Sequence, residues 1–330
     1  MKICLIRLDK IGDLVSTLPV DQIPELKGHT VRWVIAEGLG FLAKRADPHR
    51  EFFEIPLPNT ALAQKKLRDY LREEKFDLAV FFYGPWWVSK ILWQAHVPRR
   101  FGRRSQWHSY LLLNEGLRQS RSQGLRHEAD YNLELLLAAL KGAIGREEIA
   151  QGRTAPVLSL RPGTFRHLFE KFELHGQDYF VVHPGMAGSA LNWPTKNYVT
   201  LIDQLKIEKE VVITGTKADE RWLAPLKERF GQDPRVQILQ DQLSLDELLF
   251  ILKNSAGVVA PSTGILHLAA SVGVPCVGIY SPIASQNPRR WGPRGHHAHF
   301  LLAKCPEGTP ESKMNLESVT PEQVIECLRP

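Results

Sequence analysis

The chain has 330 residues, a hydrophobic fraction of 43%, a charged fraction of 24% and a formal net charge of +6. This length exceeds one small core and fits two domains of ordinary size, and the composition is that of a soluble globular protein. The modest positive charge fits phosphorylated small molecules, an anionic membrane surface or nucleic acid, and it does not choose among them.

The N-terminal segment and the cysteines indicate the compartment. Arg7, Asp9, Lys10 and Asp13 interrupt the first apolar run, which argues against a signal peptide, and no stretch is long and apolar enough to span a bilayer. The four cysteines form no C-x-x-C pair, so the sequence predicts neither a zinc site nor a disulfide framework, and a reducing compartment is the simplest setting. We therefore expect a cytoplasmic protein.

In the first half of the chain, apolar strands alternate with amphipathic helices. Strands are expected at 2–7, 31–36 and 77–84, with a helix before Pro19 and another at 59–74. This alternation predicts a mostly parallel, doubly wound sheet. Neither G-x-G-x-x-G after the first strand nor G-x-x-x-x-G-K-[ST] anywhere is present, which excludes an NAD-type fingerprint and a P-loop.

Asp13 follows the first predicted strand closely, and Gly12 is expected to permit a tight turn there. Ligands bind at the carboxyl edge of open α/β sheets, which makes this aspartate a candidate functional residue. The alternative is an acidic residue in the first turn of a helix, where it favours the helix dipole.

Between residues 85 and 110, aromatic and basic residues are interleaved. Such a pattern fits a phosphorylated lipid head group at a membrane surface, which we prefer, or single-stranded nucleic acid. The alternative is a buried aromatic helix followed by a solvated basic loop. The residues concerned are Trp86, Trp87, Trp93 and Trp107 with Lys90, Arg99, Arg100, Arg103 and Arg104.

The domain boundary is expected in the middle of the chain. A helix beginning near His127 carries core leucines, and the segment that follows is richer in glycine, proline and charge, with a short helical patch at 164–172. We expect an N-terminal domain at 1–160, a linker at 161–177 and a C-terminal domain at 178–330. The capped terminal helix, which begins after Thr320, is placed with the second domain or packed back on the first.

The second half repeats the strand and helix alternation. Strands are expected at 178–183, 210–214 and 236–239, and helices at 196–206, up to Phe230, and at 244–254, the last with a capping box of Ser244 and Glu247. The Pro184-Gly185 turn leads into a small-residue loop whose amides could face a phosphate.

Residues 260–282 read as a strand, a small-residue turn, a helix from near Thr263 to Gly273, and a further strand. The first amides of a helix have no partner within it, so the turn suits an anion such as a diphosphate. An ordinary strand-turn-helix with Ser262 or Thr263 as N-cap is the alternative. For His296, His297 and His299 we prefer an exposed loop to a metal site, because no carboxylate or cysteine lies close in sequence.

Four segments resemble glycosyltransferase family 9, which includes the ADP-heptose:lipopolysaccharide heptosyltransferases. They occur in the family's order and spacing between Lys2 and about Trp291, and H-E-x-x-Y-N at His127 is also similar. The segments are IRLDKIGDLVSTLPV, HPGMAGSALNWPTKNYVTLIDQL, VVITGTKADE and PSTGILHLAASVGVPCVGIYSP.

The resemblance implies a fold, an activity and roles for individual residues. The implied fold is GT-B, with two doubly wound, Rossmann-like domains facing across a cleft, acceptor on the first and nucleotide-sugar on the second. Family members invert at the anomeric carbon and need neither metal nor cofactor. Asp13 would be the catalytic base. The other implied roles are binding of the donor diphosphate (Ser262, Thr263, Gly264, His267, Gly185, Met186), the nucleoside (Gly215, Glu220, and less strongly Asp219) and the acceptor (Arg7, Lys10, Gly12, Arg103).

Two positions depart from the family pattern. Many members have Asp-Thr-Gly where this chain has Ser262-Thr263-Gly264, and a basic residue before Trp-Pro where it has Leu191-Asn192. The resemblance implies transfer of a heptose or related sugar, with ADP-heptose as the first donor to test, to an anionic glycolipid at the inner membrane surface. The partners would be this donor and acceptor, with peripheral membrane contact and no nucleic acid. A family member that has lost turnover and binds a nucleotide or glycan is the alternative.

Overall fold

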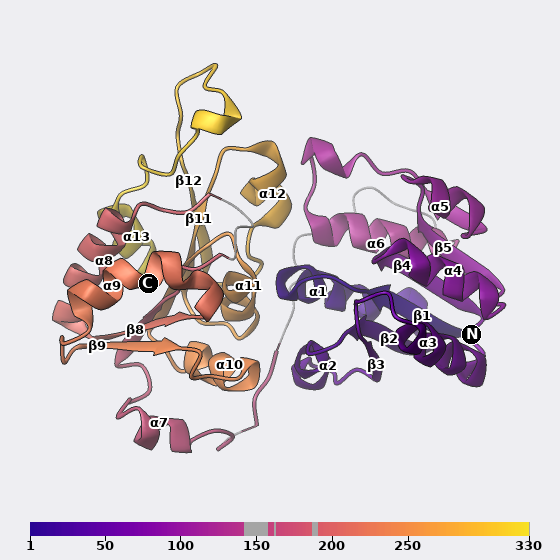
Figure 1. Ribbon diagram of the computed structural model, residues 1–330, viewed down its shortest axis with the longest axis horizontal. Coiled ribbons are helices and arrows are strands. Elements are labelled where there is room, and N and C mark those ends of the chain that lie inside the picture. Colours follow the sequence, from indigo (N-terminus) through magenta and orange to yellow (C-terminus); the bar gives the residue numbers. More distant parts are fainter. Residues whose placement is uncertain (142–157, 162, 187–190, 330) are drawn as a thin grey trace. The chain divides into compact units, whose positions relative to one another are not determined.

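The computed structural model describes residues 1–141, 158–161, 163–186 and 191–329. The chain divides into two compact units, which we call the first unit (residues 1–121 with 126–156) and the second unit (residues 122–125 with 157–330). Each unit contains one six-stranded sheet. The two sheets appear in Figure 1 in the indigo-to-magenta and the rose-to-yellow parts of the chain.

The sheet of the first unit is parallel, with strand order β3-β2-β1-β4-β5-β6. The chain adds strands in one direction from β1 and then returns to add β4 on the other side of β1. In such sheets, ligands bind beside the carboxyl ends of the two strands at this reversal. The strands are β1 (Lys2–Arg7), β2 (Thr30–Ala36), β3 (Phe52–Ile55), β4 (Leu78–Tyr83), β5 (Arg99–Arg103) and β6 (Glu115–Leu117).

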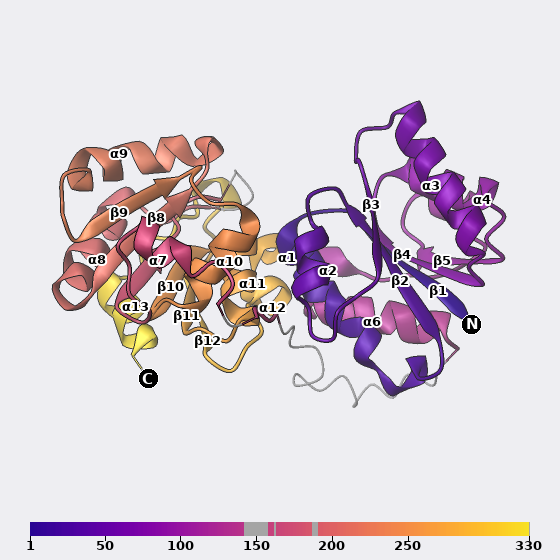
Figure 2. The ribbon, with the colours of Figure 1, turned by 90° about the horizontal axis from the view of Figure 1, so that it is seen from below.

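Helices cover both faces of this sheet. Helix α1 packs with α6, and α3 packs with α4 (Figure 2). Side chains alternate between the faces along a strand, so Cys4, Ile6 and Leu8 enter the core under α3 and α4, whereas Arg7 points to the α6 face. The helices are α1 (Ile11–Thr17), α2 (Gly40–Arg45), α3 (Ala61–Glu74), α4 (Trp86–Gln94), α5 (Trp107–Leu111) and α6 (Glu128–Ala139).

The sheet of the second unit has the same topology. Its order is β12-β11-β10-β7-β8-β9, again parallel, and the reversal falls between β7 and β10. The strands are β7 (Tyr179–Val182), β8 (Glu210–Gly215), β9 (Val236–Gln240), β10 (Gly257–Pro261), β11 (Cys276–Tyr280) and β12 (Ala298–Leu302).

The helices of the second unit also lie on two faces. Helices α8, α9 and α13 contribute to one large core cluster, and α10 packs with α11. The terminal helix α13 therefore packs on α8 and the strands of the second unit. The helices are α7 (His167–Lys171), α8 (Thr195–Glu208), α9 (Glu220–Phe230), α10 (Leu245–Lys253), α11 (Gly264–Ser271), α12 (Pro288–Trp291) and α13 (Pro321–Leu328).

The predicted doubly wound fold is confirmed, and several local expectations need correction. Residues 99–103 form strand β5 instead of a solvated loop, because Arg99 pairs with Glu115 and Arg100 donates to the carbonyls of Val97 and Leu112. Strands β3, β6 and β12 and helix α2 were not expected from the sequence. The short helical patch expected within the linker is present as α7, whose Leu168 is fully buried.

Residues 187–190, which belong to the predicted phosphate-facing loop, lie outside the described residues. Among the helices that are described, none combines the length and the apolar character that crossing a bilayer requires.

Candidate functional site

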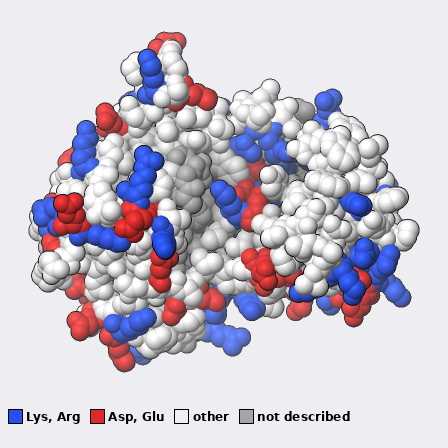
Figure 3. Space-filling model, in the orientation of Figure 1, with Lys and Arg blue, Asp and Glu red and all other residues white. Residues whose placement is uncertain are grey.

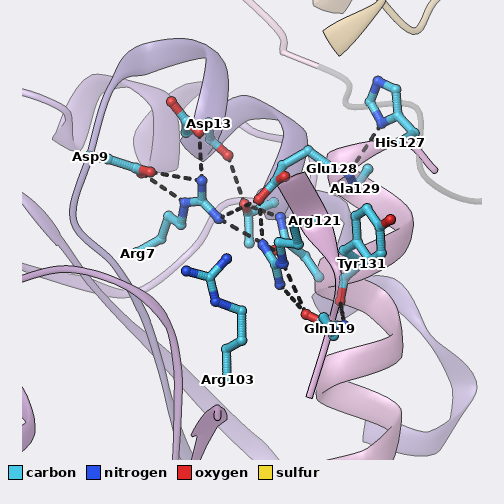
Figure 4. Close-up of polar contacts among 12 residues, drawn as sticks. Arg7, Asp9, Asp13, Arg103, Gln119, Arg121, His127, Glu128, Ala129 and Tyr131 are labelled. Atoms are coloured by element: carbon cyan, nitrogen blue, oxygen red, sulfur yellow. Dashed lines mark hydrogen bonds and ion pairs between the residues drawn. The ribbon is translucent and has the colours of Figure 1, made fainter. Parts of the chain in front are cut away.

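A charged cluster occupies the carboxyl end of β1, at the reversal point of the first sheet (Figure 4). The Arg7 guanidinium binds Asp9 through two parallel hydrogen bonds, Nε to Oδ1 and Nη2 to Oδ2, each 2.7 Å long. Its Nη2 also donates to Oδ1 of Asp13 at 2.6 Å. The Arg7 side chain is 2% exposed and that of Asp13 is 19% exposed. Arg7 therefore fixes the Asp13 carboxylate from its buried side and leaves the aspartate accessible to solvent.

Burial and neighbouring charge act against each other in this cluster. Burial alone would lower the pKa of Arg7, but the carboxylates of Asp9, Asp13 and Glu128 outweigh it, so the net shift is upward. Burial raises the pKa of Asp9 to about 7, with Asp13 adding to the rise and Arg7 opposing it. Arg7 therefore remains a cation, and burial favours the protonated form of Asp9.

A second layer, contributed by α6 and Arg121, lies beneath Arg7. Nη1 of Arg7 is 3.3 Å from Oδ1 of Asn132, and Arg121 contacts both Glu128 and this same amide oxygen. The Asn132 amide donates to Oγ1 of Thr17, which donates in turn to the backbone carbonyl of Asp13. Asp13 is thus held at its carboxylate by Arg7 and at its backbone by a chain that begins on α6.

The residues predicted to bind the acceptor have different surroundings. Arg7 is buried among carboxylates, which favours a positioning role over direct contact with a ligand. Lys10 is the exposed residue before α1, and Arg103 on β5 points toward the cluster (Figure 4). Gly12 lies buried within α1 and not in a turn before it, so the expected tight turn is wrong. The cation of Arg103 contributes to lowering the pKa of Arg121, for which burial is the larger cause.

In the second unit, three predicted donor segments follow neighbouring strands at one edge of the sheet. Gly185 and Met186 come after β7, Gly215 ends β8, and Ser262 to Gly264 follow β10. Because β7 and β10 are the strands at the reversal, parallel pairing brings these loops to the same crevice of the sheet.

Thr263 is the residue before α11, and its side chain makes no capping hydrogen bond. Its Oγ1 is buried and has no hydrogen-bond partner in the part of the chain that the structure describes. Buried hydroxyls are almost always paired, so an unpaired one beside the free amides of a helix start is suited to an acceptor atom of a ligand. His267, also predicted to bind the diphosphate, lies in the second turn of α11 and is 7% exposed.

Gly185 packs directly on the carboxylate of Asp219. A Cβ added to Gly185 would lie 2.2 Å from Cγ of Asp219, so a larger residue fits only if the Asp219 carboxylate is displaced. Asp219 is buried in the short helix η4 (Lys217–Asp219) and accepts hydrogen bonds from the amide and hydroxyl of Thr216 at 3.0 and 2.8 Å. Burial lowers the pKa of His183 to about 4, opposed by the charge of Asp219. Nδ1 of His183 lies 2.9 Å from Oγ1 of Thr214.

The predicted nucleoside residues differ in their exposure. Gly215 packs on Leu223, with room for no Cβ, since that atom would lie 2.7 Å from Cδ1 of the leucine. Glu220 lies on the surface, where it pairs with Lys227 at 2.8 Å and accepts from Gln240. Asp219, the less favoured carboxylate in the sequence, is the buried one of the two.

Residues at and beside the positions that depart from the family pattern make hydrogen bonds within the chain. The Asn192 amide donates to the carbonyl of Pro184 at 2.8 Å, and its Oδ1 accepts from the hydroxyl of Tyr198 at 3.1 Å. Trp193, which follows, donates from Nε1 to the carbonyl of Val319 at 2.9 Å. Burial raises the pKa of the Tyr280 phenol, and a hydrogen bond with Ser262 opposes this rise. Asn192 thus joins Pro184 to Tyr198 of α8 through its side-chain hydrogen bonds.

The three C-terminal histidines are exposed, with His299 on β12 and the other two before it. Across the described ranges, no group of three or more His, Cys, Asp or Glu side chains could hold a metal ion.

A family model for glycosyltransferase family 9 (heptosyltransferase) matches residues 64–318 of this chain. The chain belongs to glycosyltransferase family 9. This glycosyltransferase is 27% identical over 98% of its length to a Haemophilus influenzae protein provisionally named a glycosyltransferase, of which 94% is covered. It is 25% identical over 87% of its length to lipopolysaccharide heptosyltransferase 2 of Escherichia coli, of which 85% is covered.

A solved structure has the same fold. The family 9 chain superposes on the E. coli ADP-heptose LPS heptosyltransferase II with a TM-score of 0.79 and 22% identity, covering 99% of this chain and 97% of that one. The fold is therefore GT-B, with two Rossmann-like units.

Several residues in these two sites were not assigned a role from the sequence. In the first unit they are Asp9, Thr17 and Arg121, and in the second His183, Thr214 and Asn192. The similarity at H-E-x-x-Y-N was a usable signal, because its Glu128 and Asn132 both contact the arginines under Asp13. For Arg121 no sequence signal exists, since its partners are brought together only by the fold.

Proposed function

We propose that this glycosyltransferase moves a heptose or related sugar, with inversion and without a metal ion, from a nucleotide-sugar to a hydroxyl of a lipopolysaccharide core or similar cell-surface glycan. ADP-heptose is the proposed donor, as the names of the similar E. coli proteins suggest. The observation that carries the proposal is Asp13, a partly exposed carboxylate that a buried arginine fixes at the ligand-binding edge of the first sheet.

Asp13 is proposed as the general base. It accepts the proton of the acceptor hydroxyl while the acceptor oxygen bonds to the anomeric carbon of the donor sugar. The bond from that carbon to the diphosphate oxygen breaks, and its electron pair leaves with the diphosphate. A single displacement of this kind inverts the configuration at the anomeric carbon.

The start of α11 is proposed to receive the diphosphate. The unpaired Oγ1 of Thr263 can donate to a phosphate oxygen, and the first amides of α11 supply further donors and the positive end of the helix dipole. Donors in place before the reaction stabilise charge as it develops on the leaving group. Gly185 and Met186, next to Asp219, are proposed to line the other side of the same crevice.

The surface over α4 and α5 supports peripheral contact with the inner membrane. Five large side chains are strongly exposed here, and Figure 3 shows this region as mainly uncharged, with basic side chains nearby. Aromatic side chains with basic neighbours favour the interface of an anionic bilayer. The five are Trp86 (44%), Trp93 (53%), Trp107 (62%), Tyr110 (48%) and Leu111 (72%).

The proposal is tested by following ADP release from ADP-heptose with a deacylated inner-core acceptor, with a chelator present. We expect turnover by the unmodified protein and a loss of roughly a hundredfold or more in Asp13→Asn, because general-base catalysis contributes about that much. Asp69→Asn is the matched control, since Asp69 pairs with Lys65 on the surface of α3 and should keep full activity.

Each part of the proposal can fail separately. Equal rates in Asp13→Asn and the unmodified protein would remove Asp13 as the base. A requirement for divalent metal would contradict metal independence, and a product with retained anomeric configuration would contradict inversion. ADP binding without turnover across a panel of donors and acceptors would favour a protein that only binds nucleotide or glycan.

A further inference from the structure

The first unit has a pocket of about 450 Å³ between α3 and the end of α4. Its lining combines two arginines and a histidine with a tryptophan and an amide, and it includes no carboxylate. The residues are Arg68, Arg72, Trp93, Gln94 and His96.

This pocket is distant from the edge of the sheet that carries Asp13. Helix α4 begins at the carboxyl end of β4 and runs for nine residues, about 14 Å, toward the opposite edge, and the pocket lies at its far end. Helix α3 ends at that same edge, just before β4 begins. The pocket is therefore separate from the proposed transfer site.

The two arginines lie one turn apart on α3 and are not neutralised there. Arg72 donates from Nη2 to the carbonyl of Gln94 at 3.2 Å, and Arg68 has no hydrogen-bond or ion-pair partner within the described residues. Of the three acidic residues of α3, Asp69 pairs with Lys65 at 3.1 Å and Glu74 with Arg32 at 2.9 Å, and Glu73 is exposed and makes no ion pair with either arginine within the described residues. Like charges at this spacing repel, so an anion between them would relieve an unfavourable contact.

Two further features indicate a ligand that carries other groups besides the anion. Oε1 of Gln94 is buried and has no hydrogen-bond partner in the described part of the chain, so it is an acceptor that needs a donor such as a hydroxyl. Trp93 beside it is 53% exposed and offers an apolar face to a ring or a carbon chain. His96 completes the pocket from a left-handed backbone position with φ of 57°.

We propose that this pocket binds a phosphate group attached to a hydroxyl-bearing unit. The phosphate lies between Arg68 and Arg72, a hydroxyl donates to Oε1 of Gln94, and the carbon skeleton packs on Trp93. Two sources have this chemistry: a soluble sugar phosphate, and a phosphoglycerol head group in a bilayer. The site does not depend on the proposed transfer reaction.

Binding is measured with two probes that separate these sources. The soluble probe is glucose 6-phosphate, by calorimetry, and the membrane probe is phosphatidylcholine vesicles with and without phosphatidylglycerol, by co-sedimentation. For one of the probes we expect about a tenfold or larger loss of affinity in Arg68→Gln/Arg72→Gln, because charge-assisted hydrogen bonds are removed. Gln94→Leu should also weaken that probe although it changes no charge.

The matched control is Lys65→Gln/Lys66→Gln, which removes the same charge from α3 outside the pocket. It should change affinity by less than about twofold for the soluble probe and less than the arginine pair does for vesicles. Equal losses in the two double variants, or no effect of Gln94→Leu, would reduce the pocket to a generally basic surface and overturn the proposal. So would a failure of both probes to bind. Circular dichroism of each variant checks that it is folded.

Discussion

The two units have the same strand order, but they differ in whether the polar side chains at the reversal point are already paired within the chain. At the end of β1 the crevice is filled by the chain's own charges, with Arg7 binding two aspartates and an α6 network behind it. At the end of β10 the buried hydroxyl of Thr263 has no partner within the described residues, and Gly185, which follows the neighbouring strand β7, packs on Asp219. The topology thus supplies a position for a site, and the side chains at the strand ends decide its chemistry.

This difference predicts that the first crevice mainly affects folding stability and the second mainly affects ligand binding. An ionic cluster whose charges are paired within the chain contributes to folding and holds its accessible carboxylate in one place. A buried donor without a partner lowers stability until a ligand accepts its hydrogen bond. Substitutions in the first crevice should therefore be felt in folding, and those in the second in ligand affinity.

The largest effect is expected from Arg7→Met. Removing the guanidinium leaves Asp9, Asp13 and Glu128 without their shared cation, and breaking a buried ion pair in this way costs about 3–5 kcal/mol. Urea-induced unfolding measures the loss. Arg229→Met is the control, since Arg229 is 54% exposed in its pair with Asp203 and should cost less than about 1 kcal/mol. Similar losses in the two variants would mean that the cluster does not stabilise the first unit.

A smaller effect, on ligand affinity and not on stability, is expected from Thr263→Val. The valine keeps the shape and removes a hydroxyl that makes no bond within the described protein, so stability should be unchanged or slightly higher. ADP affinity, measured by calorimetry, should fall about tenfold because a hydrogen bond to a charged phosphate is lost. Thr263→Ser retains the hydroxyl and should retain the affinity. A loss of stability without loss of affinity would reverse the contrast between the units.

The smallest effects concern pH, and they have opposite signs in the two units. The raised pKa of Asp9 means that its stabilising contribution is present below about pH 4 and is lost as the pH rises toward about 7. The lowered pKa of His183 means that its contribution is present above about pH 6.5 and is lost as the pH falls toward about 4.

Unfolding free energies of Asp9→Asn and His183→Asn, relative to the unmodified protein, should therefore diverge across this range. The stabilising effect of Asp9 should shrink with rising pH and that of His183 should grow. If the two stability differences changed with pH in the same direction, the assignment of opposite pKa shifts to Asp9 and His183 would be wrong.

The sequence predicted the sheet cores and the strand ends better than it predicted the interiors of the sites. Apolar strands such as β10 and capped helices such as α10, whose Ser244 and Glu247 form the expected capping box, depend on local pattern and were found. Strand β5 was missed because its arginines are neutralised by Glu115 and by backbone carbonyls from other elements, which no local pattern reveals.

The same reason limits the prediction of the sites. Asp13 and Thr263 could be identified because they follow strands within a recognisable motif. Asp13 is bound by Arg7 of β1, which is contacted in turn by α6, and the buried position of Asp219 against Gly185 depends on how two loops meet. The aromatic stretch was ambiguous because one helix has both kinds of tryptophan, with Trp87 buried and Trp86 exposed, and only the packing of α4 on the sheet separates them.

The hydrogen bond from Trp193 to the carbonyl of Val319 joins the last segment of the chain to the proposed donor crevice. Trp193 directly follows Asn192, which holds the carbonyl of Pro184, so only a few covalent and hydrogen bonds separate the start of α13 from Gly185. The segment before α13 thus helps to hold the residues that follow β7 in place. We therefore expect a truncation that removes Val319 and α13 to lower donor affinity, although it removes no residue of the proposed donor site.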